Sequence, residues 1–248
     1  MRTVFLVVLI SLQTLSGPQP DVQSVVSAVS RNAQEFRDKL PDLVCTEKIT
    51  STTLESGKVQ KQKIVESLFS VLKSREYREV FAVDGKAVKK TSNLPDLPVD
   101  IGGTFSFHVL LTFLPQYLKD YDFKFEGNAD PAGTWILLFE TKPDQKSLKW
   151  DLDGSRIAKD SGKAWIDIGS SEVVRIERSL LNLPRKYQEW KVAVDQAPTL
   201  IGGKQLWIPK TFRTDITERD SQKTASFVAE YTNCRKFGAD VSVTPATP

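Results

Sequence analysis

Hydrophobic residues recur every three or four positions most clearly in one early segment, residues 21–40. This spacing is typical of an α-helix that has one apolar stripe and a polar remainder. Asp21 is a suitable N-cap for the helix, and Pro41 ends it. An apolar stripe of this kind needs a surface to cover. The stripe consists of Val22, Val25, Val26, Val29, Ala33, Phe36 and Leu40.

After Leu43 the pattern changes to an alternation of apolar and polar residues, which predicts about ten β-strands. Asp84 and Gly85 are a strong signal of a two-residue hairpin turn, and such neighbouring strands pair antiparallel. The clearest strands cover residues 44–54, 59–73, 75–83, 86–90, 135–140, 162–168, 172–183, 187–194, 205–217 and 224–231. Shorter alternating stretches lie at 121–125 and 148–152, and 233–243 is a candidate final strand.

One strongly apolar segment, residues 105–114, interrupts the strands. It lies between a Gly- and Pro-containing connection at 92–103 and Pro115. We predict a short helix here, with a strand as the alternative. The residues that suit one helical face are Phe105, Val109, Leu110, Phe113 and Leu114, while Phe107 and Leu111 make the other side partly apolar.

These elements predict a mainly β protein of the α+β class. A sheet of this many strands curls, so we expect a curved antiparallel half-barrel. The N-terminal helix and the short apolar helix would cover its concave face. No fixed repeat and no linker divides the chain. The predicted organisation is a leader at residues 1–20, a single domain at 21–243 and a disordered tail at 244–248.

The first residues predict export. Arg2 is followed by an apolar run at residues 4–15 and then by Ser16, Gly17 and Pro18, which is the order of a secretory signal peptide. The run is too short to span a bilayer, and no transmembrane segment is expected in the mature protein. We therefore expect a periplasmic or secreted protein. A buried N-terminal strand is the alternative reading.

Composition limits the kinds of ligand and metal site that the protein can hold. The 248 residues are 40% hydrophobic and 26% charged, and the net charge is only +3, so there is no electrostatic case for nucleic-acid binding. Two cysteines and one histidine are too few for a zinc cluster or an iron–sulfur site, and no metal or cofactor is predicted. In an oxidising compartment Cys45 and Cys234 are a disulfide candidate. Two separate buried thiols are the alternative.

No catalytic site is predicted. The sequence carries no motif of the serine hydrolases, P-loop proteins, dinucleotide-binding proteins or zinc proteases. His108 is the only imidazole, and we expect it to be packed or to lie at a rim. The carboxylate pairs Asp120/Asp122 and Asp151/Asp153 are predicted to be solvated.

Surplus apolar residues suggest a ligand cavity inside the curved sheet, with the 105–114 helix as its lid. Apolar walls would take up an acyl chain at about 0.8 kcal/mol per buried CH₂, and few polar groups would be needed. An ordinary packed core is the alternative. The candidate lining residues are Phe105, Phe107, Leu110, Leu111, Phe113, Leu114, Trp135, Phe139, Trp165 and Trp190.

Several segments resemble the LolA-like family of exported lipoprotein-carrier and outer-membrane lipoprotein-sorting proteins. The local matches are residues 75–86, 162–168, 174–177 and 206–209, and residues 40–46 look like the start of uncharacterised exported proteins of Acidobacteria. The resemblance implies an unclosed barrel whose concave face is plugged by helices. It also implies an apolar cavity for acyl chains.

The first functional hypothesis is an exported binding module for a lipid, a lipoprotein acyl chain or another apolar ligand, without catalysis. The second is a structural or interaction protein of the cell envelope with a fully packed core and an envelope protein as partner. The third is a secreted hydrolase that uses a carboxylate site, which would place two carboxylates in one cleft with strongly shifted pKa values.

Overall fold

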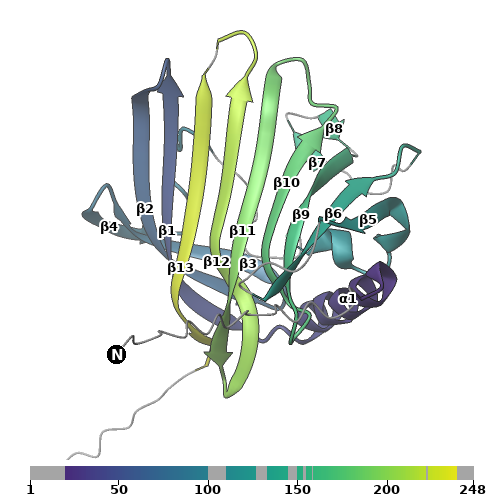
Figure 1. Cartoon of the computed structure of the whole chain (residues 1–248). Coiled ribbons are helices and arrows are strands. Elements are labelled where there is room, and N and C mark those ends of the chain that lie inside the picture. The colour runs from purple at the N-terminus through teal and green to yellow at the C-terminus, as the bar shows by residue number, and fades with distance from the viewer. Residues whose placement is uncertain are drawn as a thin grey trace, which may run out of the picture.

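In the part of the chain that the structure describes, an antiparallel sheet of eleven strands forms the body of the protein (Figure 1). The computed structural model describes residues 20–99, 110–126, 133–144, 150–152, 155–157, 159–221 and 223–238. The predicted leader, except residue 20, and the predicted tail at 244–248 lie outside these residues. The strands lie in the order β4-β3-β2-β1-β13-β12-β11-β10-β9-β6-β5. This confirms the predicted mainly β fold.

Most strands lie where the alternation of residues predicts them. They are β1 (Leu43–Glu55), β2 (Lys58–Leu72), β3 (Arg75–Val83), β4 (Lys86–Thr91), β5 (Tyr121–Phe125), β6 (Thr134–Thr141), β9 (Lys159–Asp167), β10 (Val173–Leu181), β11 (Tyr187–Ile201), β12 (Lys204–Glu218) and β13 (Thr224–Lys236). A separate hairpin pairs β7 (Trp150–Leu152) with β8 (Ser155–Ile157).

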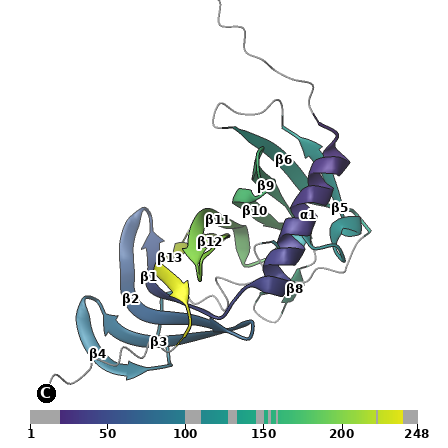
Figure 2. The ribbon, with the colours of Figure 1, turned by 90° about the horizontal axis from the view of Figure 1, so that it is seen from below.

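The predicted N-terminal helix is confirmed as α1 (Val22–Lys39). The Asp21 carboxylate accepts a hydrogen bond of 3.0 Å from the Ser24 backbone N–H, so it caps the helix as expected. The sheet curves, and α1 lies across the inside of the curve near β5, β6 and β9 (Figure 2). We call the face toward α1 the inner face and the opposite face the outer face.

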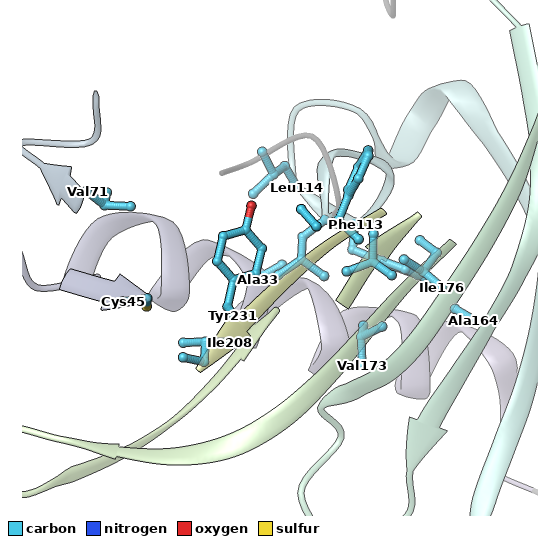
Figure 3. Close-up of a cluster of buried hydrophobic side chains, with 14 of the residues drawn as sticks. Ala33, Cys45, Val71, Phe113, Leu114, Ala164, Val173, Ile176, Ile208 and Tyr231 are labelled. Atoms are coloured by element: carbon cyan, nitrogen blue, oxygen red, sulfur yellow. The ribbon is translucent and has the colours of Figure 1, made fainter. Parts of the chain in front are cut away.

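Alternate residues of the strands turn to the inner face and form one core. Val26, Val29 and Ala33 of α1 are buried in the same cluster as Ala164 and Ile166 of β9. Figure 3 shows side chains from α1, the chain before β5 and several strands meeting in this cluster. The helix stripe therefore has the apolar surface that its sequence requires.

The apolar segment before β5 differs from the prediction. Its described part holds a single 3-10 turn, η1 (Leu111–Phe113), and a second 3-10 turn follows, η2 (Leu118–Asp120). Leu114 has extended backbone angles, φ −68° and ψ 138°. A residue before proline avoids the α conformation, so Pro115 ends the turn after three residues. Residues 105–109 lie outside the described residues.

Two strand boundaries also differ. β11 continues past residue 194 to Ile201, and its second half pairs with β12 although it contains Pro198. β13 runs without a break to Lys236, so a separate strand starting at residue 233 is wrong. Asn233 has a positive φ of 53°, and the β1–β13 register shifts beside it. A bulge within one strand therefore interrupts the alternation of apolar and polar residues there.

The predicted disulfide is confirmed. Cys45 of β1 and Cys234 of β13 are bonded with an S–S distance of 2.02 Å and are 189 residues apart in sequence. The bond joins the first strand of the chain to the last one, and these strands are neighbours in the sheet. It therefore closes almost the whole described chain into one loop.

Replacing both cysteines, Cys45→Ala with Cys234→Ala, should lower the free energy of unfolding by up to about 5 kcal/mol. Closing so long a loop removes much of the entropy of the unfolded chain. Urea unfolding of the variant and of the wild type, with and without reductant, measures the effect. Equal midpoints for all samples would contradict this role of the disulfide.

A residue with a side chain does not fit at position Gly162 of β9, because neighbouring atoms lie close to its backbone. A Cβ atom there would lie 2.0 Å from the Glu177 backbone oxygen and 2.6 Å from Cζ of Phe139. We expect Gly162→Ala to lower the free energy of unfolding by about 2 kcal/mol or more, because the ring and two strands would have to move. Gly238→Ala is the control, since a Cβ there meets nothing within 4 Å. Equal urea midpoints for the two variants would refute the steric argument.

Candidate functional site

A groove of about 400 Å³ opens on the inner face, where the end of α1 meets the hairpin between β11 and β12. We call it the inner groove. Its apolar walls come from the helix and the link that follows it, from the residue before η1 and from the hairpin. Leu110 and Ile201 are buried, whereas the others are half-buried. The apolar lining residues are Phe36, Pro41, Leu110, Ile201, Leu206 and Trp207.

Charged residues surround these apolar walls. Three lysines line the groove, and they come from α1, β12 and β13. Lys39 pairs with Glu35 one helical turn earlier, at 2.7 Å, and both side chains are exposed. Hydrogen bonding and the charge of Lys39 lower the pKa of the Glu35 carboxyl. The charged lining residues are Glu35, Lys39, Glu172, Lys204 and Lys236.

Glu172 is the ionisable group of the groove whose environment is least like water. It is half-buried on the short link between β9 and β10. Burial, together with the negative charges of Glu35 and Asp167, raises the pKa of Glu172 to about 7. The side chain therefore changes charge near neutral pH.

The turn that carries Glu172 is fixed to the rest of the fold. The Asp167 carboxylate accepts hydrogen bonds of 2.7 Å from both the backbone N–H and the hydroxyl of Ser170. These bonds lower the pKa of Asp167. The Asn32 side-chain amide donates to the Ser170 carbonyl at 2.9 Å, which ties the turn to α1. The position of Glu172 at the groove thus depends on the docking of the helix.

Glu172 should make stability depend on pH. The folded state holds its proton up to about pH 7, whereas the unfolded chain releases it near the ordinary value of 4.5. Stability should therefore fall as pH rises between these values, by on the order of 2 kcal/mol once solvent screening of the partly exposed side chain is allowed for. In Glu172→Gln this part of the pH dependence should disappear, so the variant should be more stable than the wild type at pH 8.

Thermal unfolding at pH 5 and pH 8 checks this expectation. Glu140→Gln is the control, because Glu140 is an exposed side chain of β6. If Glu172→Gln and the control have the same pH dependence as the wild type, the raised pKa is wrong.

A second hollow of about 650 Å³ lies on the outer face, over β5, β6 and the strands from β9 to β12. Small side chains of the middle strands line it, and they are Ser161, Ser179 and Ala193. The strand register places these residues on the face opposite the core. The hollow is therefore separate from the inner groove.

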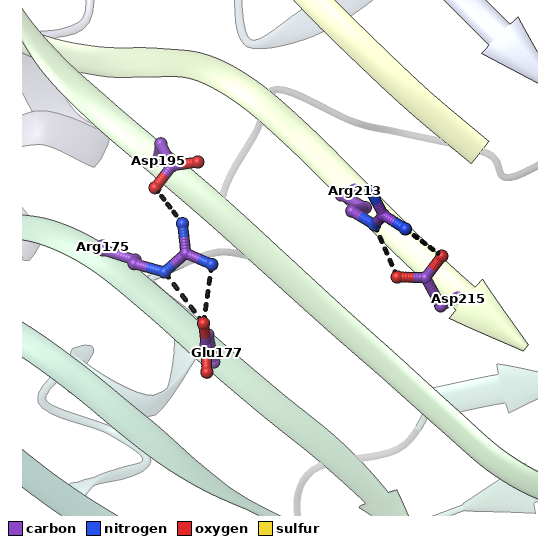
Figure 4. A network of polar contacts seen from close by, with 5 residues as sticks. All are labelled: Arg175, Glu177, Asp195, Arg213 and Asp215. Atoms are coloured by element: carbon purple, nitrogen blue, oxygen red, sulfur yellow. Dashed lines mark hydrogen bonds and ion pairs between the residues drawn. The ribbon is translucent and has the colours of Figure 1, made fainter. Parts of the chain in front are cut away.

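Charged side chains at the outer hollow are largely engaged with one another. Arg175 donates hydrogen bonds of 2.9 and 2.6 Å to Glu177 and another to Asp195, and Arg213 donates at 2.6 and 3.0 Å to Asp215 (Figure 4). These carboxylates raise the pKa of both arginines, although burial opposes the effect. Such paired groups suit a solvated sheet surface. The inner groove, which combines apolar walls with a half-buried carboxyl, is the stronger candidate site.

The predicted ligand-lining residues of the 105–114 segment mostly belong to the core. Leu110 lines the inner groove, but Phe113 and Leu114 are buried and are 0% and 2% exposed. Phe139 is 2% exposed and forms an edge contact with the Phe113 ring, with centroids 6.3 Å apart. Leu111 is half-buried against the same core. Phe105, Phe107 and His108 lie outside the described residues.

The three predicted tryptophans do not lie together. Trp135 is on the inner face, where its ring centroid lies 5.4 Å from that of Phe125. Trp190 packs against Tyr187 at 5.2 Å in a separate small cluster. Trp165 is on the outer face, because its neighbours in β9 turn inward. The prediction that it lines the concave face with the others is therefore wrong.

A buried ion pair that the sequence did not indicate lies under the 3-10 turns. Asp160 accepts hydrogen bonds from Arg178 at 2.8 Å, from the Tyr121 hydroxyl at 2.7 Å and from the Thr141 hydroxyl at 2.9 Å. Burial, together with the charge of Asp160, raises the pKa of Tyr121. Asp120 is also fully buried, so its predicted solvation is wrong. Asp122 is exposed, as expected.

A second buried ion pair lies in the other half of the sheet. Arg78 makes a two-bond contact with the fully buried Glu47 at 2.8 and 2.9 Å, and the Ser67 hydroxyl donates to the same carboxylate at 2.7 Å. Burial opposes the charge of Arg78, but these bonds and the charge of Glu47 raise its pKa. Removing one partner of such a pair is costly, and we assign it a structural role.

Within the part of the chain that the structure describes, no group of three or more His, Cys, Asp or Glu residues could hold a metal ion. No described helix is long and apolar enough to cross a membrane.

No protein-family model matches the chain, and no curated protein matches it. Among solved structures, a DUF1329 family protein from Desulfovibrio piger is 13% identical with a TM-score of 0.40, covering 90% of this chain and 95% of that chain. A LolA superfamily protein from Nitrosomonas europaea is 12% identical with a TM-score of 0.36, covering 89% and 96%. A chain of the Pseudomonas aeruginosa MucA/MucB complex is 12% identical with a TM-score of 0.22, covering 87% and 100%. These similarities are distant, and membership of the LolA-like family stays a prediction.

Proposed function

We propose that this protein is an exported binding module that holds an acyl chain of a lipid or lipoprotein in the inner groove, without catalysis. The observation that carries the proposal is the groove itself. Apolar walls from α1 and the β11–β12 hairpin remain open beside a closely packed core. A volume of about 400 Å³ lies in the range of small-ligand sites.

The energetics of an acyl chain suit this groove. Burying about eight methylene groups would contribute about 6 kcal/mol, before the entropic cost of association. Phe36 and Leu206 are half-buried at the groove, so a ligand would cover apolar surface that is otherwise partly in water. The lysines at the groove would attract the anionic end of such a molecule.

We also propose that the protein is exported, which suits this ligand. The Cys45–Cys234 disulfide is of a kind that persists in oxidising compartments such as the bacterial periplasm. Acyl chains of envelope lipids are abundant there, and a soluble carrier would shield them from water.

A secreted hydrolase is the second candidate, and one observation favours it. Glu35 and Glu172 both line the inner groove, and their pKa values are shifted in opposite directions. Two carboxyl groups with separated pKa values can serve as acid and base. Glu35, however, is exposed and paired with Lys39, an arrangement common on helix surfaces. We therefore favour the binding module.

Filling the groove should weaken binding strongly. Gln205 is an exposed residue of its lining, so Gln205→Trp adds volume there without removing a core contact. We expect the variant to bind cis-parinaric acid at least tenfold more weakly than the wild type, as measured by fluorescence titration and by displacement with palmitate. Gln60→Trp, on an exposed position of β2, is the control and should bind like the wild type.

Two results would overturn the proposal. One is a wild type that does not bind parinaric acid. The other is equal binding by Gln205→Trp and Gln60→Trp, which would place the probe elsewhere. Cleavage of a glycoside or ester substrate that Glu172→Gln abolishes would instead establish the hydrolase.

A further inference from the structure

We propose that the inner groove selects lipids whose head group carries a phosphate next to a primary ammonium, with Glu172 receiving the ammonium and the lysines receiving the phosphate. This inference rests on the proposed function, because it assumes that the groove holds the acyl chain. It names the head group that the charged lining would recognise.

The Glu172 carboxylate lines the groove, whereas the backbone of this residue is held in the turn. Its backbone is used by the turn, because the N–H donates to the Ser170 hydroxyl at 3.3 Å and the carbonyl accepts from the Asp167 N–H at 2.9 Å. Within the described ranges, no hydrogen bond or ion pair engages the Glu172 side chain. A half-buried carboxylate that lines a groove in this state suits a cationic partner, since it has already lost part of its hydration.

Two lysines of the groove supply the positive charge. Lys204 begins β12 and Lys236 ends β13, and neither has an ion pair among the described residues. The Lys236 side chain lies against the hairpin turn, where a Cβ on Gly202 would be 3.0 Å from its Cδ. Lys39 is already engaged with Glu35. Two lysines on neighbouring elements are thus available for one anionic group.

Anionic, cationic and zwitterionic head groups would fit these charges to different degrees. A purely anionic head group would be attracted by the lysines but repelled by Glu172 and Glu35 once both are ionised. A purely cationic one would meet three lysines. A zwitterion of the phosphoethanolamine type satisfies both signs, and its primary ammonium can donate hydrogen bonds to the carboxylate. A choline head group has the same charges but no N–H donor.

The pH dependence follows from the groups that face Glu172. These are Glu35 and Lys39 on α1, Asp167 on β9, Lys204 on β12 and Lys236 on β13. Burial, with Glu35 and Asp167, raises the pKa of Glu172 to about 7, so the carboxylate is mostly protonated at pH 6 and mostly ionised at pH 8. The preference for an ammonium head group should therefore increase from pH 6 to pH 8.

The experiment compares three soluble lysophospholipids that share one acyl chain and carry phosphoethanolamine, phosphocholine or phosphoglycerol. Isothermal titration of the full-length exported protein at pH 8, below the critical micelle concentration, gives each Kd. We expect the phosphoethanolamine lipid to bind about tenfold more tightly than the phosphoglycerol lipid. In Glu172→Gln this preference should vanish, mainly through weaker binding of the phosphoethanolamine lipid.

Controls separate recognition from misfolding. Glu140→Gln changes an exposed side chain of β6, a strand that contributes no residue to the groove lining, and should keep the wild-type preference. The double variant Lys204→Gln with Lys236→Gln should weaken all three phospholipids but not a neutral monoacylglycerol of the same chain length. Thermal melts of every variant establish that it is folded.

The outcomes distinguish this inference from the proposed function. Equal Kd values for the three lipids, or an unchanged preference in Glu172→Gln, would overturn the head-group assignment while leaving the acyl-chain groove intact. Failure of the wild type to bind any of the lipids, including the monoacylglycerol, would overturn the proposed function itself.

Discussion

The packing of one helix against the inner face of the sheet is the interaction on which the rest of the structure depends. Val26, Val29 and Ala33 are buried there together with residues of the central strands. This contact is complete over the middle of α1 but not at its C-terminal end, where Phe36 is only half-buried. The inner groove lies at that end, between the helix and the β11–β12 hairpin. The core and the candidate site are therefore two parts of the same interface.

Polar groups inside the core are held in self-contained networks. Asp160 with Arg178 and Glu47 with Arg78 are buried ion pairs whose hydroxyl partners satisfy further lone pairs. Glu172 differs from these carboxylates because it is less buried and faces a groove instead of an arginine. That contrast is the physical reason to assign it to recognition and the others to structure.

Local patterns predicted the helix and the strands well. They did not predict which residues from distant parts of the chain contact one another. The helix stripe, the Asp84–Gly85 hairpin and the disulfide partners depend on nearby residues or on the number of cysteines, and all three are confirmed. The described end of the predicted 105–114 helix is a 3-10 turn, because Leu114 precedes Pro115 and takes an extended conformation. Glu172 and Asp160 could not be found, since only the pairing of strands distant in sequence brings them to their neighbours. The prediction that Trp165 lines the concave face is wrong, and the alternation in β9 already indicates that this side chain lies on the outer face.

The central claim is that the space left between α1 and the β11–β12 hairpin accommodates an acyl chain. A crystal structure of the protein soaked with a fatty acid brominated near the end of its chain tests this most directly, because anomalous scattering locates the bromine without reference to the protein. We expect a bromine peak beside Phe36 and Leu206. A peak only in the outer hollow, or no peak at a concentration that saturates binding in solution, would contradict it.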